Sequence, residues 1–160
     1  MNGLTLIADG ELFAVDVTAV ERVVRNMTYT PVPAAPDAVA GIAGLKGGIV
    51  TILSLSELLG RGRGEQSNHA VVFKPFASGD SQMGLLIDSP GDLITINDSE
   101  IFPPHMAAEA EEGSIISGLA ETGGKLYRII DVYSIPDKLG DSGKKPSGVS
   151  QGGSENYEEG

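Results

Sequence analysis

The chain is divided into short apolar runs by turns that contain glycine, and this spacing constrains the fold more than any other feature. In residues 12–17 apolar side chains occupy alternate positions, so they lie on one face of an extended strand. The preceding Asp9-Gly10 pair is typical of a two-residue hairpin turn. We therefore predict a β-hairpin formed by residues 4–8 and 12–17.

Comparable runs recur along most of the chain. They predict further strands at residues 20–25, 39–45, 49–55, 70–73, 83–88, 93–96, 115–120 and 126–132. Residues 30–36 hold three prolines, which fix φ and lack an N–H donor, so we expect a stiff loop there. Many short strands in a chain with 22 glycines predict an all-β fold.

Helical signal is confined to two short segments. Residues 56–59 stop at Gly60, and residues 134–139 stop at Gly140. Each begins with a serine that can cap a helix, and each ends at a glycine, which commonly terminates one. We expect both to be single helical turns.

One pattern occurs twice. Residues 41–55 contain a Gly-apolar-Ala triplet, a Gly-Gly pair and an apolar strand, and residues 118–132 repeat that order 77 positions later. Two related small barrels that pack together would explain this echo, and barrel closure would also remove exposed strand edges. The other interpretation is that these short motifs recur by chance in a glycine-rich chain.

The domain organisation follows from where apolar residues stop. We predict one folded domain over residues 1–139 of the 160, and a disordered, acidic, Gly/Ser-rich tail over residues 140–160. Residues 60–67 are expected to be a flexible loop between the barrels.

Composition excludes several functions. With a formal net charge of −11 and only 11 Lys and Arg residues, the chain lacks the basic surface that nucleic acid requires. It has no cysteine, so thiol catalysis and Cys-ligated metals are excluded. No apolar run approaches the length of a membrane span and no signal peptide is evident, so we expect a cytoplasmic protein without membrane insertion.

A search for catalytic chemistry yields structural interpretations. His69 and His105 lack neighbours at ligand spacing, and Asp88 and Asp131 end apolar runs, where carboxylates usually cap turns. Arg61 and Arg63 stand between glycines, a weak context for phosphate binding. We therefore expect no catalytic residue, no metal and no cofactor.

Lys46 differs from the other charged residues because the glycine turn Lys46-Gly47-Gly48 would present it outward at a fixed place. Such a cation suits docking to an acidic partner, although a merely solvated turn lysine remains an equal alternative.

Taken in order, several segments resemble the CheW-like domain family. The most specific is Gly41-Ile42-Ala43-Gly44-Leu45-Lys46-Gly47-Gly48. The resemblance continues through residues 13–17, 20–23, 31–36, 55–60, 83–88, 101–104 and 126–139.

The resemblance implies two SH3-like, five-stranded β-barrels packed together with short helical turns. It implies a non-catalytic chemotaxis adaptor that joins the regulatory domain of a CheA-type histidine kinase to the cytoplasmic tip of chemoreceptors, with a groove between the barrels for a receptor helix. It places the partner-binding residues at Val20, Glu21, Arg22, Ile42, Lys46, Gly47, Leu86 and Ile87.

The chain departs from the family pattern where charge matters. Arg22 stands in place of a glutamate and Lys46 in place of an arginine, and Thr51 and Ser54 replace a proline and an aspartate. Lysine cannot form the two-pronged contact of arginine, and arginine inverts the charge of glutamate. Two alternatives therefore stay open: a CheW-like module of another signalling or motility pathway, and a small-ligand-binding β-barrel.

Overall fold

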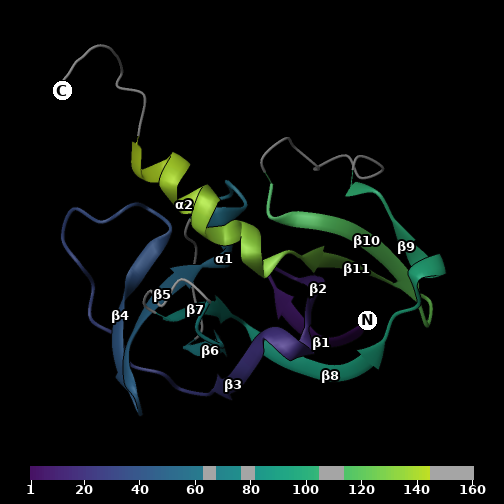
Figure 1. The fold of residues 1–160 in the computed structure, drawn as a ribbon, viewed down its shortest axis with the longest axis horizontal. Helices are drawn as coiled ribbons and strands as arrows, with labels where there is room; N and C mark the ends of the chain where they lie inside the picture. The colour runs from purple at the N-terminus through teal and green to yellow at the C-terminus, as the bar shows by residue number, and fades with distance from the viewer. Residues whose placement is uncertain (63–67, 77–81, 105–113, 145–160) are drawn as a thin grey trace.

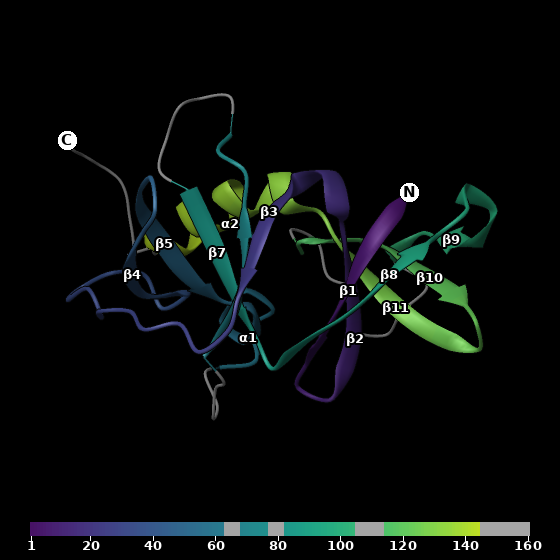
Figure 2. The ribbon, with the colours of Figure 1, turned by 90° about the horizontal axis from the view of Figure 1, so that it is seen from below.

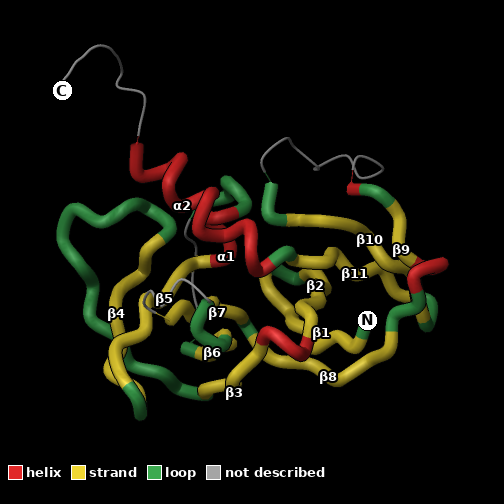
Figure 3. The backbone as a smooth tube through the Cα atoms, viewed as in Figure 1, coloured by secondary structure: helices red, strands yellow, loops and turns green. Residues whose placement is uncertain are grey.

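The computed structural model describes residues 1–62, 68–76, 82–104 and 114–144, and in it the chain forms two β-sheets that share one core (Figures 1 and 3). The first sheet has the strand order β8-β1-β2-β11-β10-β9. Its strands are β1 (Asn2–Ala8), β2 (Glu11–Asp16), β8 (Ser89–Thr95), β9 (Ile101–Phe102), β10 (Ile116–Thr122) and β11 (Lys125–Ile130).

The second sheet has the order β3-β6-β7-β5-β4. Its strands are β3 (Val20–Val24), β4 (Val39–Leu45), β5 (Gly48–Ser54), β6 (His69–Phe73) and β7 (Gln82–Ile87). The helices are α1 (Leu55–Leu58) and α2 (Ile135–Lys144), with single 3-10 turns η1 (Val17–Ala19), η2 (Asp98–Glu100) and η4 (Val132–Ser134).

The all-β prediction with two packed β-units is confirmed, with two corrections. The first sheet has six strands and not five, because β9 pairs with β10. In both sheets the ladder of paired strands ends at two different edge strands, so neither is closed by backbone pairing.

The first hairpin forms as the sequence predicts. β1 and β2 pair antiparallel from Gly3 with Asp16 to Ala8 with Glu11. The Asp9-Gly10 turn has φ of 54° and 74° at its two residues, a left-handed conformation that aspartate and glycine tolerate better than most residues.

The two halves of the chain exchange their hairpins. β1 and β2 do not pair with β3, β4 or β5, which follow them in the chain. They belong to the sheet of β8, β10 and β11, through the ladders β1–β8 and β2–β11. Reciprocally, β6 and β7 join β3, β4 and β5 through β3–β6 and β5–β7. Figure 2 shows the resulting two layers of strands at opposite sides of the molecule. The expectation that residues 60–67 separate two sequential barrels is therefore wrong.

The echo at 77 residues is real at the level of backbone pairing. β4–β5 pairs Gly41 with Ile52, and β10–β11 pairs Gly118 with Ile129. All later pairs of the two ladders keep the same offset, and each ladder shifts register directly before its glycine. Such agreement in register excludes a chance recurrence of glycine motifs.

The shared core binds the sheets together. Leu6, Phe13 and Val15 of the first sheet are fully buried in one cluster with Leu53 and Leu85 of the second. Burial of each large apolar side chain stabilises the fold by roughly 1.5–3 kcal/mol. Because the cluster draws on both sheets, the described chain is one cooperative unit and not two independent ones.

Both helical predictions need correction. Helix α1 begins one residue earlier than expected because Ser54, and not Ser56, accepts the capping hydrogen bond from the Glu57 amide. Helix α2 continues through Gly140 to Lys144 and is no single turn. Its buried Ile135 anchors it on the core, which outweighs the low helix propensity of one glycine. The prediction that the tail is disordered from residue 140 is wrong for residues 140–144, which continue α2, and residues 145–160 lie outside the described residues.

Candidate functional site

The turn that carries Lys46 joins β4 to β5. Gly47 has φ of 100° and Gly48 of 146°, a region that favours glycine. A Cβ at either glycine would meet nothing within 4 Å, so backbone conformation and not space requires glycine there. The turn therefore projects the exposed Lys46 from the end of the second sheet, as the sequence predicts.

Arg22 links this turn to the opposite edge of the same sheet. Its Nη2 atom donates a hydrogen bond of 3.0 Å to the carbonyl oxygen of Lys46. Arg22 lies on β3 and Lys46 follows β4, the two edge strands of the second sheet. The sheet therefore curls until its edges are joined by a side chain, and two cationic residues meet at one place.

Glu21, the neighbour of Arg22 in sequence, forms its side-chain contact with β7 and not with the Lys46 turn. It is exposed, and Gln82 at the start of β7 donates from Nε2 both to its carboxylate and to the Phe73 carbonyl oxygen, the latter over 3.0 Å. No ion pair between Glu21 and Arg22 occurs in the described chain. The positive charge of Arg22 is thus not neutralised by its neighbour in sequence.

The remaining predicted residues divide between surface and core. Ile42 on edge strand β4 is 36% exposed, and Val20 is half-buried against the shared core. Leu86 and Ile87 are only 4% and 2% exposed, because β7 lies between β5 and β6 inside the second sheet. Ile42 is therefore accessible at the surface, whereas Leu86 and Ile87 belong to two buried core clusters.

Among the residues that the structure describes, the most exposed large apolar side chain is one that the sequence pattern does not single out. Leu93 is 69% exposed on β8, an edge strand of the first sheet, although its partner across the ladder, Leu4, is buried. The apolar run that contains Leu93 predicts a strand. Whether that strand lies at the edge of a sheet depends on pairing with distant residues, which no local sequence pattern indicates. In Figure 1, β8 and β3 follow the same border of the molecule, so Leu93 and Arg22 stand on the edge strands of that border.

The residues considered for catalysis have structural contacts. His69 Nδ1 accepts a hydrogen bond of 3.3 Å from the Asn26 amide, Asp88 accepts one of 2.9 Å from the Asp9 amide, and Asp131 accepts one of 3.1 Å from the Tyr133 amide. His105 lies outside the described residues.

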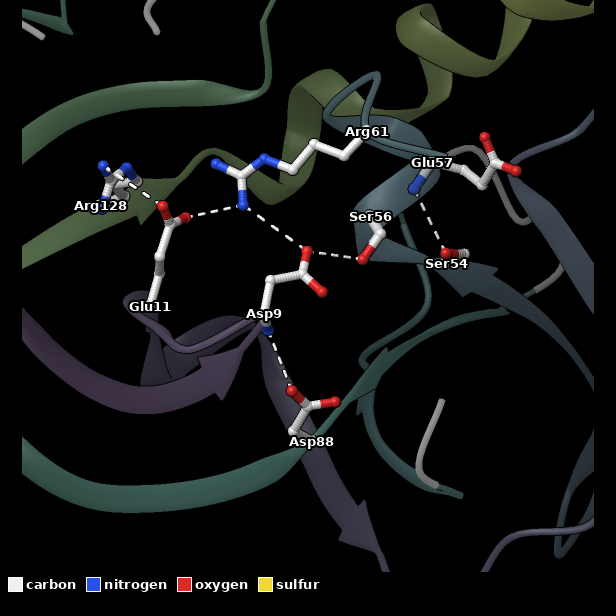
Figure 4. A network of polar contacts seen from close by, with 8 residues as sticks. All are labelled: Asp9, Glu11, Ser54, Ser56, Glu57, Arg61, Asp88 and Arg128. Atoms are coloured by element: carbon white, nitrogen blue, oxygen red, sulfur yellow. Dashed lines mark hydrogen bonds and ion pairs between the residues drawn. The ribbon is translucent and has the colours of Figure 1, made fainter. Parts of the chain in front are cut away.

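Arg61 is not a free phosphate-binding side chain. It pairs with Glu11 at 2.7 Å and with Asp9 at 3.5 Å (Figure 4). Its predicted companion Arg63 lies outside the described residues.

The described ranges hold no cluster of three or more His, Cys, Asp or Glu side chains suited to a metal ion. No described helix has the length and apolar content needed to cross a membrane.

Known proteins share this architecture and sequence. The model of the CheW-like domain matches residues 2–139. Proteins named Chemotaxis protein CheW are similar: that of Rhizobium meliloti is 28% identical over 77% of this chain and 79% of its own length, and that of Thermotoga maritima 25% identical over 85% and 87%. The crystal structure of the scaffolding protein TtCheW from Thermoanaerobacter tengcongensis superposes with a TM-score of 0.71 at 25% identity, covering 81% of this chain and 87% of that one. Because the matched segment includes every strand of both sheets, the chain belongs to the CheW-like domain family.

Proposed function

We propose that this chain is a non-catalytic adaptor of chemotaxis signalling that couples a CheA-type histidine kinase to methyl-accepting chemoreceptors. The observation that carries the proposal is the match of the whole two-sheet fold, residues 2–139, to a family whose relatives are named chemotaxis proteins and whose solved neighbour is named a scaffolding protein. The expected partners are the regulatory domain of the kinase and the cytoplasmic tip of the receptors. Such an adaptor works in the cytoplasm.

The partner surface follows the open edges of the sheets. Val20 and Arg22 lie on one edge strand of the second sheet and Lys46 follows the other, the two edges being joined by the Arg22 hydrogen bond, and Leu93 stands on an edge of the first sheet. A receptor helix is read by apolar side chains along one of its faces, and charged residues at the rim select the orientation. The two cations, with the exposed Ile42 on β4, therefore fit a helix that carries carboxylates next to its apolar face.

Three further residues complete the proposed surface. Glu21 is an exposed carboxylate on β3, beside Arg22 in sequence. Gly47 keeps the turn in its conformation, and Ile42 adds apolar area on β4. Leu86 and Ile87 contribute by shaping the sheet beneath.

A second candidate function is a CheW-like module that serves another signalling or motility pathway. The contact between Arg22 and Lys46 favours it. The family pattern has a glutamate and an arginine at these two positions, whereas this chain has two cations, which would select a partner of different charge. This alternative changes the identity of the kinase and receptor and leaves the adaptor role in place.

The test is direct binding with purified components. The chain is titrated separately with the kinase regulatory domain and with a receptor tip from the same organism. We expect a complex with each, and we expect Lys46→Ala to weaken at least one of them by roughly threefold to tenfold, the effect of removing an exposed docking charge.

Lys125→Ala is the matched control, because Lys125 is an exposed cation at the start of β11, beside the hairpin turn of the first sheet. The control should bind as the unchanged chain does. Absence of any complex with both partners would contradict the adaptor function, whereas binding only to a kinase and receptor of another pathway would favour the second candidate.

A further inference from the structure

A network of charged and polar side chains bridges the two sheets at the β1–β2 turn (Figure 4). Glu11 receives arginines from two directions: Arg61 Nη1 lies 2.7 Å from its Oε1, and Arg128 Nη2 lies 3.7 Å from its Oε2. Arg61 follows α1, which is joined to the second sheet, whereas Arg128 belongs to β11 of the first sheet. One carboxylate thus holds groups from both layers.

Asp9 reinforces the same junction. Ser56 of α1 donates a hydrogen bond of 2.7 Å to Asp9 Oδ2, and Arg61 lies 3.5 Å from that oxygen. The Asp9 amide donates over 2.9 Å to Asp88, the residue between β7 of the second sheet and β8 of the first. The turn of the first sheet is therefore attached to α1 and to the crossover between the sheets.

Arg61 lies directly behind the end of α1. Gly60 and Gly62 flank it with φ of 77° and 78°. Two backbone hydrogen bonds close the helix end and fix where the arginine leaves it: one from the Gly60 amide to the Glu57 carbonyl oxygen, and one from the Arg61 amide to the Ser56 carbonyl oxygen. The side chains of Arg61 and Glu11 are each 29% exposed, but the Glu11 Oε1 atom that meets Arg61 is itself buried, so water and salt screen the pair only in part. The apolar core below stays buried whether or not the pair is formed.

We propose that Arg61 and Glu11 form an electrostatic latch that fixes the angle between the two sheets. With the latch closed, the edge strands of both sheets are presented in one arrangement. With the latch open, the sheets remain folded around their shared core but sample a wider range of angles. The latch thus controls the geometry of the surface without touching a partner, and its test needs no partner.

The test measures the distance between the sheets directly. The chain has no cysteine, so spin labels can be attached at two introduced cysteines only. Gly44→Cys and Glu121→Cys suit this purpose, because they occupy equivalent positions of β4–β5 and β10–β11 and are both exposed, and a Cβ at Gly44 meets nothing within 4 Å. Pulsed electron paramagnetic resonance then gives the distribution of distances between the labels.

We expect a narrow distribution in the otherwise unchanged chain and a broader one in Arg61→Ala and in Glu11→Gln. Arg61→Lys should stay narrower than Arg61→Ala, because it keeps a cation within reach of Glu11 and Asp9. Glu57→Gln is the matched control: it removes a carboxylate from α1 beside the network, and it should stay narrow.

Amide exchange supplies a second readout on the same variants. The amides of Arg61 and Asp9 both report on the latch, and we expect their exchange to accelerate roughly threefold to tenfold in Arg61→Ala and Glu11→Gln, as the loss of a partly exposed ion pair allows. Unchanged distance distributions in both Arg61→Ala and Glu11→Gln, a distribution in Arg61→Lys as broad as that in Arg61→Ala, or equal broadening in Glu57→Gln would overturn the proposal.

Discussion

The hairpins β4–β5 and β10–β11 have the same backbone and different surfaces. Their pairing register agrees residue for residue, and a bulge precedes Gly41 in one and Gly118 in the other. Yet the turn of the first hairpin is Lys46-Gly47, and that of the second is Gly123-Gly124. The repeat is kept where the backbone is constrained and differs where the chain meets solvent.

The outer edges of the two hairpins differ in the same sense. β10 is covered by β9, which pairs through two residues and leaves Leu119 only 5% exposed. β4 meets the single bridge between Thr30 and Ile42, and Ile42 stays 36% exposed. Both related edges thus have a backbone partner at the same position, and they differ in the exposure of the side chain there, buried for Leu119 and exposed for Ile42. A duplicated fold can present two unlike faces in this way.

The largest expected effect tests the equivalence of the two central strands. Phe13 of β2 and Met83 of β7 occupy matching places beside the parallel partner strands, with 0% and 9% exposure. Replacing a buried Phe with Ala costs about 3–5 kcal/mol, and the less buried Met about 2–3 kcal/mol. Denaturant unfolding of Phe13→Ala and Met83→Ala measures both, and a larger loss in Met83→Ala would contradict the comparison.

Next in size is the close approach at the two bulge glycines. A Cβ at Gly41 would stand 2.4 Å from the Thr30 carbonyl oxygen, whereas one at Gly118 would stand 3.1 Å from that of Phe102. We expect Gly41→Ala to lose about 2–3 kcal/mol of unfolding free energy and Gly118→Ala about 1 kcal/mol, because overpacking forces the backbone to shift.

Gly44→Ala serves as the control for both glycine variants, because a Cβ there meets nothing within 4 Å. Thermal unfolding of the three variants should show the largest loss of stability in Gly41→Ala, a smaller loss in Gly118→Ala and the smallest in Gly44→Ala. Equal losses at Gly41 and Gly44 would show that steric contact does not determine these positions.

A smaller effect concerns the caps that follow each hairpin. Ser54 accepts a hydrogen bond of 3.3 Å from the Glu57 amide, and Asp131 accepts one of 3.1 Å from the Tyr133 amide. These residues are equivalent in the repeat, so Ser54→Ala and Asp131→Ala should each cost about 1 kcal/mol. Denaturant unfolding checks this, and a loss confined to one of them would break the equivalence.

The smallest effect on stability is expected at the turn where the hairpins differ. Lys46→Ala should leave the unfolding free energy within about 0.5 kcal/mol, as for most exposed substitutions. A loss well beyond that value in calorimetry would mean that Lys46 supports the fold, and weaker partner binding by that variant could then not be assigned to docking.

Local patterns in the sequence predict most strands of this fold, because alternation and glycine turns act within one segment. They place β1, β2, β4 and β5 within a residue or two of their observed bounds. They miss β9, whose two residues form a strand only because β10 lies beside them. The exchange of hairpins is also beyond local reasoning, because pairing between β2 and β11 joins residues more than a hundred positions apart.

The candidate surface is predicted less completely than the fold. The turn at Lys46 is readable from its glycines, but its contact with Arg22 depends on the curl of the whole sheet. The burial of Leu86 and Ile87 follows from the position of β7 between β5 and β6. The ion pair of Arg61 with Glu11 forms because the hairpin β1–β2 belongs to a different sheet from the strands that follow it in the chain. Each of these needs the tertiary structure, since the groups that meet lie on different strands.

Reconstituted kinase control tests the adaptor function most directly. The kinase and membrane-embedded receptors of the same organism are mixed with and without this chain, and autophosphorylation of the kinase is followed before and after addition of an attractant. The account predicts that kinase activity rises and responds to the attractant only when the chain is present. Kinase activity and attractant response that are the same with and without the chain would contradict it.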